Sequence, residues 1–431
     1  MSPDLQTRFK ELAKREMVYV RGKLATQNDL SALFTVRATM LYLRSGGRLG
    51  FVLPMAALTR GQFDPLRRGS FHTSRIGWDA AWVMNDDVQP LFPVPSCVVF
   101  GRRTAVSTLP YRDAPEDVAD KQLKVLENAP ALETAQHSGG SSYRKHFRNG
   151  ATLFPRLFVF VERQQMGRLG ADPSAPFVVS RRNNLEKKPW KDLPSMANRV
   201  ETEFLYPVLL GESVLPYRIF KPFEGVVPVT DKGDVLDAAA ALARGCDGLH
   251  GWMSKSEAAW NEHRATEISL VQQFDYYGKL AAQFPIAPLR VVYAKSGTLP
   301  AAAILRDQKT INENRLYWSP VASENEAKYL VAILNSETAR KRVEAYQSRG
   351  QWGARDFDKV IFNLPIPRFD SNNKTHAALA KAAADAEKIA AAIQLPEGVK
   401  FQRARGLVRT AITKAGVAKR IDDLVAQLLD G

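Results

Sequence analysis

The sequence predicts an α/β fold in which an incomplete doubly wound unit is followed by an α+β region and a helical tail. Three patterns predict it. Residues 29–103 have the pattern of a helix, a Gly-Gly turn and buried strands, and residues 144–191 mix basic and aromatic side chains. Residues 372–395 and residues 407–429 each have the pattern of one helix. The first pattern matches the back half of a doubly wound domain, whose front half normally carries the cofactor site.

The first helix of this unit is predicted to start near residue 30. Asn28 or Asp29 can cap it, and Gly46 with Gly47 ends it, because glycine accepts the left-handed conformation that a helix stop needs. Apolar residues then form one stripe at helical spacing, namely Leu30, Leu33, Phe34 and Leu41. This spacing is typical of an amphipathic helix.

The strands of the unit follow the glycine turn. Residues 49–53 are apolar almost without interruption, which is typical of a strand that is covered on both faces of a parallel sheet. Residues 62–68 can start another helix, and residues 80–83 and 97–100 predict two further short strands. An ordinary α/β core would explain these elements without any function.

The particular residues resemble one known family. They are Asp-Leu-Ser-Ala-Leu-Phe at 29–34, Leu-Tyr-Leu-Arg-Ser-Gly-Gly-Arg-Leu-Gly-Phe-Val-Leu-Pro at 41–54, Leu-Arg at 66–67, and Leu-Phe-Pro-Val-Pro-Ser-Cys-Val-Val-Phe at 91–100. In this order they are similar to the region downstream of the catalytic motif in adenine-specific DNA methyltransferases. The nearest branch is the large restriction-modification and phage-defence type, in which the methylase and the target-recognition domain share one chain.

The resemblance also shows which motifs this sequence lacks. In the family a Gly-rich turn binds S-adenosylmethionine, and an Asn/Asp/Ser-Pro-Pro-aromatic tetrapeptide grips the adenine amino group. The sequence has no Pro-Pro pair and no Gly-x-Gly turn after an early apolar strand, and residues 1–23 correspond to a segment just after the tetrapeptide. We therefore expect a truncated enzyme with no catalytic residue of its own, which by itself does not bind the methyl donor. A misplaced start codon, a degraded gene and a split enzyme, whose first half is another polypeptide, all fit this expectation.

Two positions correspond to residues near the chemistry in the family. Phe92 matches an aromatic residue that stacks on the flipped adenine, and a core position beside a strand explains it equally well. Asp29 matches a remnant of the donor pocket, although an ordinary helix cap is the favoured explanation.

Composition narrows the class of partner. The chain has 431 residues, with 60 Lys and Arg against 45 Asp and Glu, a net charge of +15 and a pI near 9.7. This balance favours a polyanion, most simply double-stranded DNA. The six histidines and two cysteines show no metal-ligand spacing, so we expect no metal site, and Cys97 and Cys246 are expected to be reduced packing residues. Without a long apolar run or a signal-peptide core, the sequence predicts a cytoplasmic protein with no membrane span.

Basic and aromatic residues alternate in the middle of the chain, which suits a surface that holds a phosphate backbone. A solvated basic face over a core of Leu157, Val159 and Val161 is the alternative explanation. The loop at residues 351–357 adds a tryptophan and an arginine that could reach base edges or merely close the domain. The residues predicted to bind DNA are Arg144, Lys145, Arg148, Arg156, Arg181, Arg182, Lys187, Lys188, Trp352 and Arg355.

The sequence divides into three predicted domains. Residues 1–110 form a partial methyltransferase domain, residues 111–370 form a target-recognition domain with a helical insert near 234–283, and residues 371–431 form a helical tail. The insert carries aromatic residues that we expect to be packing residues, namely Trp252, Trp260, Tyr276 and Tyr277. The predicted function is the DNA-recognising C-terminal portion of a DNA adenine-N6 methyltransferase. A non-catalytic DNA-binding specificity subunit and a nonfunctional gene remnant are the alternatives.

Overall fold

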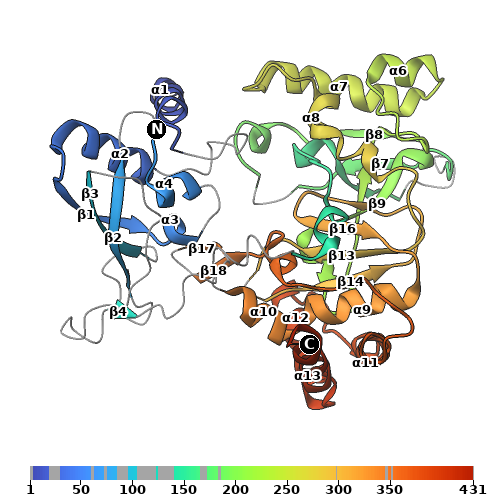
Figure 1. Cartoon of the computed structure of the whole chain (residues 1–431). Helices are drawn as coiled ribbons and strands as arrows, with labels where there is room; N and C mark the ends of the chain where they lie inside the picture. The colour runs from blue at the N-terminus through green and yellow to red at the C-terminus, as the bar shows by residue number, and fades with distance from the viewer. Residues whose placement is uncertain are drawn as a thin grey trace. The chain divides into compact units, whose positions relative to one another are not determined.

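The chain forms two compact units in a computed structural model (Figure 1). The first unit comprises residues 1–140 and 343–356, and the second comprises residues 141–342 and 357–431. The three predicted domains remain a prediction, because compact packing alone does not define folding units. The structure describes residues 3–18, 30–59, 63–71, 75–84, 96–103, 123–124, 140–165, 172–182, 186–297, 299–344, 348–350 and 353–430.

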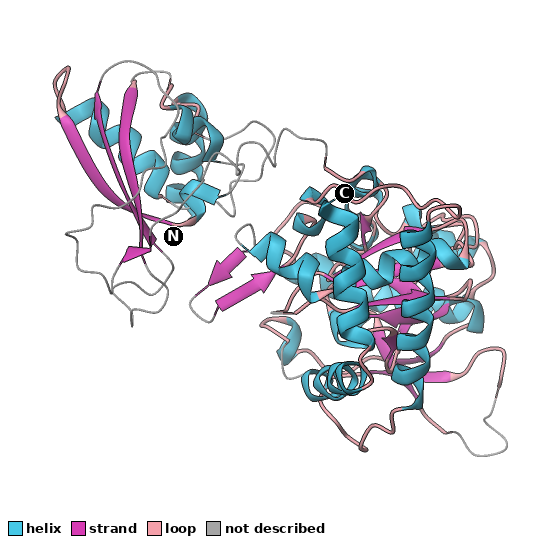
Figure 2. Ribbon diagram, turned by 60° about the horizontal axis from the view of Figure 1, so that its bottom comes forward, coloured by secondary structure: helices cyan, strands magenta, loops and turns pink. Residues whose placement is uncertain are grey.

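The first unit is a small sheet with helices on one side (Figure 2). Its helices are α1 (Pro3–Arg15), α2 (Ser31–Tyr42), α3 (Ala56–Thr59) and α4 (Asp64–Arg68). Its strands are β1 (Arg48–Pro54), β2 (Ile76–Met84), β3 (Ser96–Arg103) and β4 (Leu123–Lys124), and the hairpin of β17 (Ser348–Gly350) and β18 (Gly353–Asp356) is grouped with this unit. The order of the sheet is β1-β3-β2-β4.

The predicted parallel pairing of the strands is wrong. β3 lies between β1 and β2 and is antiparallel to both, so that β1 and β2 run in the same direction with α3 and α4 in the crossover between them. The near-continuous apolar run of β1 suggested burial on both faces. In the structure its burial alternates, with Leu49 and Leu53 in the core and Val52 47% exposed. An apolar run alone does not distinguish one covered face from two.

Helix α2 buries a different face from the one that the predicted apolar stripe indicated. Leu33 is buried with Ala32 and Val36, whereas the other members of the stripe are exposed. We define the exposed apolar face as the outward apolar side chains of α2 and of the residue before it. It consists of Leu30, Phe34, Leu41 and Tyr42, with Tyr42 82% exposed. Val52 is exposed on the other side of the sheet, because Phe51 beside it packs against Phe34. The predicted glycine stop is wrong in detail, because α2 ends at Tyr42 with Leu43 extended, and Gly46, with a φ of 75°, forms the turn that leads into β1.

The second unit contains a six-stranded sheet and a four-stranded sheet. Its strands are β5 (Arg148–Asn149), β6 (Phe160–Arg163), β7 (Phe177–Ser180), β8 (Ala197–Arg199), β9 (Leu205–Leu209), β10 (Val214–Leu215), β11 (Arg218–Ile219), β12 (Phe223–Val226), β13 (Arg290–Ala294), β14 (Ala302–Leu305), β15 (Ile311–Asn312) and β16 (Leu316–Pro320). One sheet has the order β15-β9-β12-β6-β7-β8 and the other has the order β14-β13-β16-β5, while β10 pairs with β11. The core predicted at Leu157, Val159 and Val161 is confirmed, since all three are buried.

Short helices and the helical insert pack around these sheets. The insert consists of α6 (Ala238–Ala243), α7 (Asp247–His263) and α8 (Leu270–Phe274). Trp252 and Trp260 are buried as predicted, and Trp260 stacks on Trp190 with ring centroids 5.5 Å apart. The 3-10 helices are η3 (Ser142–Lys145), η4 (Arg156–Phe158), η6 (Trp190–Asp192), η7 (Thr202–Phe204), η8 (Gly211–Ser213), η9 (Tyr276–Gly278), η10 (Ala281–Gln283) and η12 (Val360–Asn363).

The C-terminal helices cover the four-stranded sheet. They are α9 (Glu324–Asn335), α10 (Glu337–Val343), α11 (Lys374–Ala392), α12 (Phe401–Lys414) and α13 (Val417–Asp430). Ser323 caps α9, because its Oγ accepts from Glu326 N at 3.2 Å. A single helix predicted over 407–429 is wrong, since Gly416 with a φ of 72° separates α12 from α13. No helix among the described residues is long and apolar enough to cross a bilayer.

Candidate nucleic-acid interface

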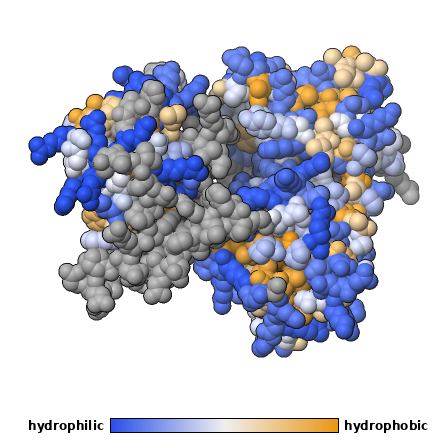
Figure 3. Space-filling model, viewed as in Figure 1, coloured by the Kyte–Doolittle hydropathy of each residue, from blue (hydrophilic) through white to orange (hydrophobic). Residues whose placement is uncertain are grey.

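Basic side chains from five separate stretches of the sequence surround the β5 edge of the four-stranded sheet. They come from η3 and β5, from the segment before η10, from the end of β13, from the turn before η12 and from the stretch after it. We define the basic patch as Arg144, Lys145, Arg148, Lys279, Lys295, Lys359 and Arg368. Figure 3 shows that hydrophilic side chains cover much of the visible face of the second unit.

Two residues far apart in sequence meet at one end of the basic patch. Lys359 Nζ donates to the backbone carbonyl of Arg144 at 3.1 Å, and the Arg144 guanidinium donates to Asn363 Oδ1. Burial, followed by the charge of Arg144, lowers the pKa of Lys359. The charged form of Lys359 is therefore disfavoured in this partly buried position beside Arg144.

A second pair of cations has the same arrangement. Burial, followed by the charge of Lys295, lowers the pKa of Lys279. The two pairs are connected through the backbone. Phe357, two residues before Lys359, donates its backbone N–H to the Lys295 carbonyl at 2.8 Å. The Lys359 ammonium also lies 5.6 Å from the ring centroid of Tyr317, which pairs with β5.

The remaining arginines extend the basic patch in both directions. Arg148 Nη1 donates to the Ala282 carbonyl in η10 at 3.4 Å. Arg368 donates to Ser142 Oγ at 3.1 Å, and its guanidinium lies 5.4 Å from the ring centroid of Tyr143. These contacts join η3, β5, η10 and the stretch after η12 into one basic surface.

The carboxylates beside the basic patch already have partners. Asp358 Oδ1 accepts from the Tyr317 hydroxyl, and Glu326 Oε1 accepts from the Tyr143 hydroxyl at 2.9 Å. The charge of Asp358 also acts to raise the pKa of Lys359, so this carboxylate partly offsets the patch at that position. Two carboxylates against seven cations leave the patch with an excess of positive charge.

The other predicted DNA-binding residues of the second unit have carboxylates beside them. Arg181 pairs with Glu162 at 3.2 Å, and Lys188 pairs with Asp192 at 3.3 Å. The Arg156 guanidinium lies 5.7 Å from the Phe160 ring centroid. The two ion pairs neutralise charge locally, and DNA contact by Arg156, Arg181 and Lys188 stays a prediction.

Arg182 is the most firmly held of this group. It pairs with Glu186 at 2.9 Å and donates to the carbonyls of Leu193, Trp190 and Lys191. Four partners hold the guanidinium against the chain, so the contacts of Arg182 in this structure are structural. Lys187, five residues further along the chain, is exposed.

The remaining predicted residues have little or no structural description. Asp29, Phe92 and Trp352 lie outside the described residues. Only the backbone of Arg355 is described, in β18. The roles predicted for these four residues stay predictions.

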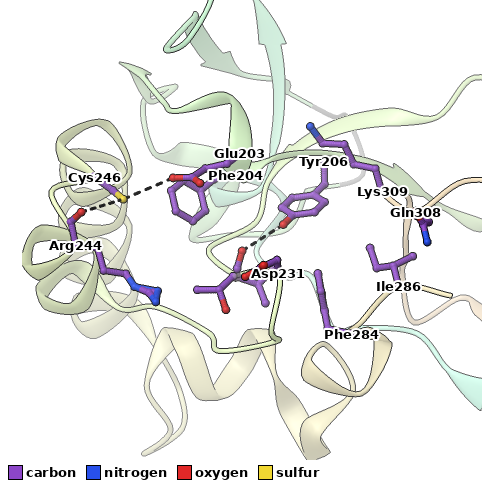
Figure 4. Close-up of a pocket in the computed structure, with 12 residues that line it drawn as sticks. Glu203, Phe204, Tyr206, Asp231, Arg244, Cys246, Phe284, Ile286, Gln308 and Lys309 are labelled. Atoms are coloured by element: carbon purple, nitrogen blue, oxygen red, sulfur yellow. Dashed lines mark hydrogen bonds between the residues drawn. The ribbon is translucent and has the colours of Figure 1, made fainter. Parts of the chain in front are cut away.

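A separate cavity of 660 Å³ lies in the second unit, away from any predicted site residue (Figure 4). Buried Phe204 and Tyr206 form part of its wall, and Glu203, Asp231, Arg244 and Lys309 bring two charges of each sign to it. Burial, followed by the charges of Glu203 and Asp231, raises the pKa of Tyr206 to about 12. The balanced charges indicate no particular class of ligand.

The described residues contain neither a metal-ligand group nor a reactive thiol. They contain no group of three or more His, Cys, Asp or Glu side chains that could hold a metal ion. Both cysteines are buried and free, and burial raises the pKa of Cys97 to about 12. A thiol in this state is a packing group rather than a nucleophile.

No protein-family model matches the chain, and no curated protein matches it. Among solved structures, its fold resembles the type IIL restriction-modification enzyme MmeI, solved in complex with DNA. The TM-score is 0.58 at 13% sequence identity, over 99% of this chain and 52% of MmeI. The type IIG restriction endonuclease BpuSI gives a TM-score of 0.29 at 15% identity, over 100% of this chain and 53% of BpuSI. This score is too low to indicate a shared fold.

The likeness to MmeI shows the fold alone. The mixed α/β chain with several sheets and a C-terminal helical region resembles part of a restriction-modification enzyme, and it spans about half the length of MmeI. Lys279, Lys295, Lys359 and Arg368 were missed by the sequence reasoning. Each is an isolated basic residue in its own segment, so only their convergence in space marks them.

Proposed function

We propose that the chain is the DNA-recognising portion of an S-adenosylmethionine-dependent DNA adenine-N6 methyltransferase of a restriction-modification or phage-defence system. The observation that carries DNA recognition is the basic patch, which joins cations from five stretches of the sequence. The fold likeness to part of a restriction-modification enzyme supports the class.

The electrostatics of the basic patch favour a polyanion. Folding brings Lys359 beside Arg144 and Lys279 beside Lys295, although burial and like charge disfavour both pairs, as the lowered pKa values of Lys359 and Lys279 indicate. Phosphates placed against these pairs would remove the repulsion and release condensed counterions. DNA binding would thus be stabilised by relieving the repulsion that these two cation pairs have in the free protein.

The first unit would supply half of the methyltransferase domain. Its glycine turn does not fit a donor site, because Gly46 N donates to the Arg103 carbonyl at 2.8 Å and Arg103 N donates to the Gly47 carbonyl at 2.9 Å. This turn follows a helix and joins α2 to β1, whereas a donor-binding turn follows a strand. The methyl donor would therefore be bound only by the complete enzyme.

The first unit also offers a surface that a donor-binding half would cover. β1 is an edge strand with no described partner beyond β3, and the exposed apolar face lies beside it on α2. Unpaired strand edges and clustered apolar side chains are typical of surfaces covered by another element. The partner we propose is an α/β polypeptide whose edge strand pairs with β1.

Two measurements test these assignments. A gel shift on duplex DNA at low ionic strength should show binding that salt weakens, and the absence of such binding would contradict DNA recognition. Calorimetry with S-adenosylmethionine should show no binding by this chain alone. Measurable donor binding would contradict the incomplete donor site.

The second candidate function is a non-catalytic DNA-binding specificity subunit. It is favoured by the location of the basic patch, which lies wholly within the second unit. Mixing the chain with the polypeptide encoded immediately upstream distinguishes the two candidates. Methyl transfer to DNA from labelled donor by the mixture supports the methyltransferase, whereas DNA binding without transfer supports the specificity subunit.

A further inference from the structure

Two tyrosines that were predicted to be packing residues are exposed. Tyr276 and Tyr277 form a turn directly after α8 and are 38% and 71% exposed, whereas Trp252 and Trp260 of the same insert are buried. The prediction was therefore wrong for both tyrosines. Their ring centroids lie 4.4 Å apart, so they form one aromatic surface.

The backbone holds this turn in an unusual conformation. Tyr277 has a φ of 60° and a ψ of 31°, in the left-handed region that a bulky side chain rarely adopts. Asp275 Oδ1 fixes the turn by accepting from Leu280 N at 2.9 Å and Ala281 N at 3.0 Å. Strained residues of this kind persist where the surroundings impose them, and they cluster at functional sites.

A buried amide pair anchors the segment that follows the turn. Gln283 Nε2 donates to the Asn312 carbonyl at 2.9 Å, and Asn312 N donates to Gln283 Oε1 at 2.9 Å. The turn is thus attached to β15 of the six-stranded sheet. An anchored turn loses little conformational entropy when it binds a ligand.

The tyrosines lie at the rim of the basic patch. The Lys279 ammonium lies 6.0 Å from the Tyr276 ring centroid and 5.8 Å from that of Tyr277. Lys279 interacts in turn with Lys295, and Arg148 donates to Ala282 three residues further along the chain. Exposed aromatic rings beside cations are what proteins use to bind single-stranded or extruded nucleotides.

A cavity adjoins the aromatic surface. It has a volume of 480 Å³ and is partly lined by Tyr276 and Tyr277, with apolar walls from Val235, Ile268 and Val271. This volume is in the range of pockets that take small organic ligands. A planar base stacked on a tyrosine would have room here.

We propose that the Tyr276–Tyr277 turn stacks on an unstacked nucleobase of the DNA that the basic patch holds, and that the adjoining cavity receives this base. The inference rests on the proposed DNA recognition. The positive charge of Lys279 and Lys295 next to the rings selects a polyanionic ligand over a neutral apolar one.

The test compares two duplexes that differ only by one bulged 2-aminopurine, with the full chain as the protein. The wild type should bind the bulged duplex more tightly and quench its 2-aminopurine fluorescence, because a bulged base is already unpaired. Tyr277→Ala should weaken binding to the bulged duplex by about 5-fold to about 150-fold and leave the fluorescence unquenched. Tyr277→Phe should behave as the wild type.

Tyr42→Ala is the matched control, because Tyr42 is also an exposed tyrosine but belongs to the first unit. It should leave both duplex affinities unchanged. Wild-type affinities for both duplexes in Tyr277→Ala, with quenching retained, would overturn the stacking role while leaving DNA recognition intact. Failure of the wild type to bind either duplex would overturn DNA recognition and the stacking role together.

Discussion

Neutralising two half-buried cations of the basic patch should weaken DNA binding without weakening the fold. The perturbation is the double variant Lys279→Gln and Lys359→Gln. Burial and a like charge lower the pKa of both lysines, so the charged forms are disfavoured in the free protein. We therefore expect the free energy of unfolding to change by less than about 0.5 kcal/mol.

The size of the effect on DNA binding follows from counterion release. If all seven patch cations contact phosphates, the slope of log K against log salt is about −6. Removing two contacts should reduce the steepness of that slope by about 2 and lower the affinity about 60-fold at 0.1 M salt and about 20-fold at 0.2 M salt.

Fluorescence anisotropy with a labelled duplex, repeated over a salt series, measures both quantities. The control is Lys374→Gln with Lys419→Gln, which removes the same charge from exposed positions on α11 and α13. We expect the control to change the affinity only slightly. A wild-type salt slope in the patch variant, or an equal loss in the control, would refute the assignment of the patch.

Three further predictions concern stability. Arg290→Ala should lower the free energy of unfolding in urea by about 3 kcal/mol, because buried Arg290 donates to the Thr310 carbonyl at 2.6 Å, and a wild-type midpoint would contradict this. Burial lowers the pKa of His376, so its contribution to stability is present above the ordinary histidine pKa and is lost as the pH falls. His376→Asn should therefore flatten the pH dependence of stability below about pH 6.5, and an unchanged slope would argue against it. Gly150→Ala should unfold the second unit or destabilise it by several kcal/mol in thermal melts, since a Cβ there would lie 2.3 Å from the Asn312 carbonyl oxygen, whereas Gly406→Ala, with open space around it, should not.

The order of elements in the first unit could be predicted from the sequence, but their directions could not. A glycine turn and short apolar runs are local signals, and α2, β1, β2 and β3 occur where those signals indicate. Strand direction depends on which partner each strand meets, and that partner can be distant in sequence. Phe34 shows the same limit, because helical spacing places it on a stripe without showing which side the sheet covers.

The residues of the candidate interface could also be predicted only in part. Arg144, Lys145 and Arg148 were predicted because they are crowded together in the sequence. Lys359 joins them only because β16 pairs with β5 and the turn before η12 returns to η3. Such convergence is a property of long-range packing, so single basic residues in separate segments carry no signal that a sequence alone can show.

The discontinuous second unit has a consequence for engineering. Ser141 Oγ donates to the Ile366 carbonyl at 2.9 Å, Phe369 N donates to the Tyr143 hydroxyl at 3.0 Å, and Ser336 Oγ donates to Asp422 Oδ1 at 2.7 Å. A graft that exchanged only residues 141–342 between related chains would break these contacts and expose the core beneath the C-terminal helices. The portable module is therefore residues 141–342 together with residues 357–430, transplanted as a pair.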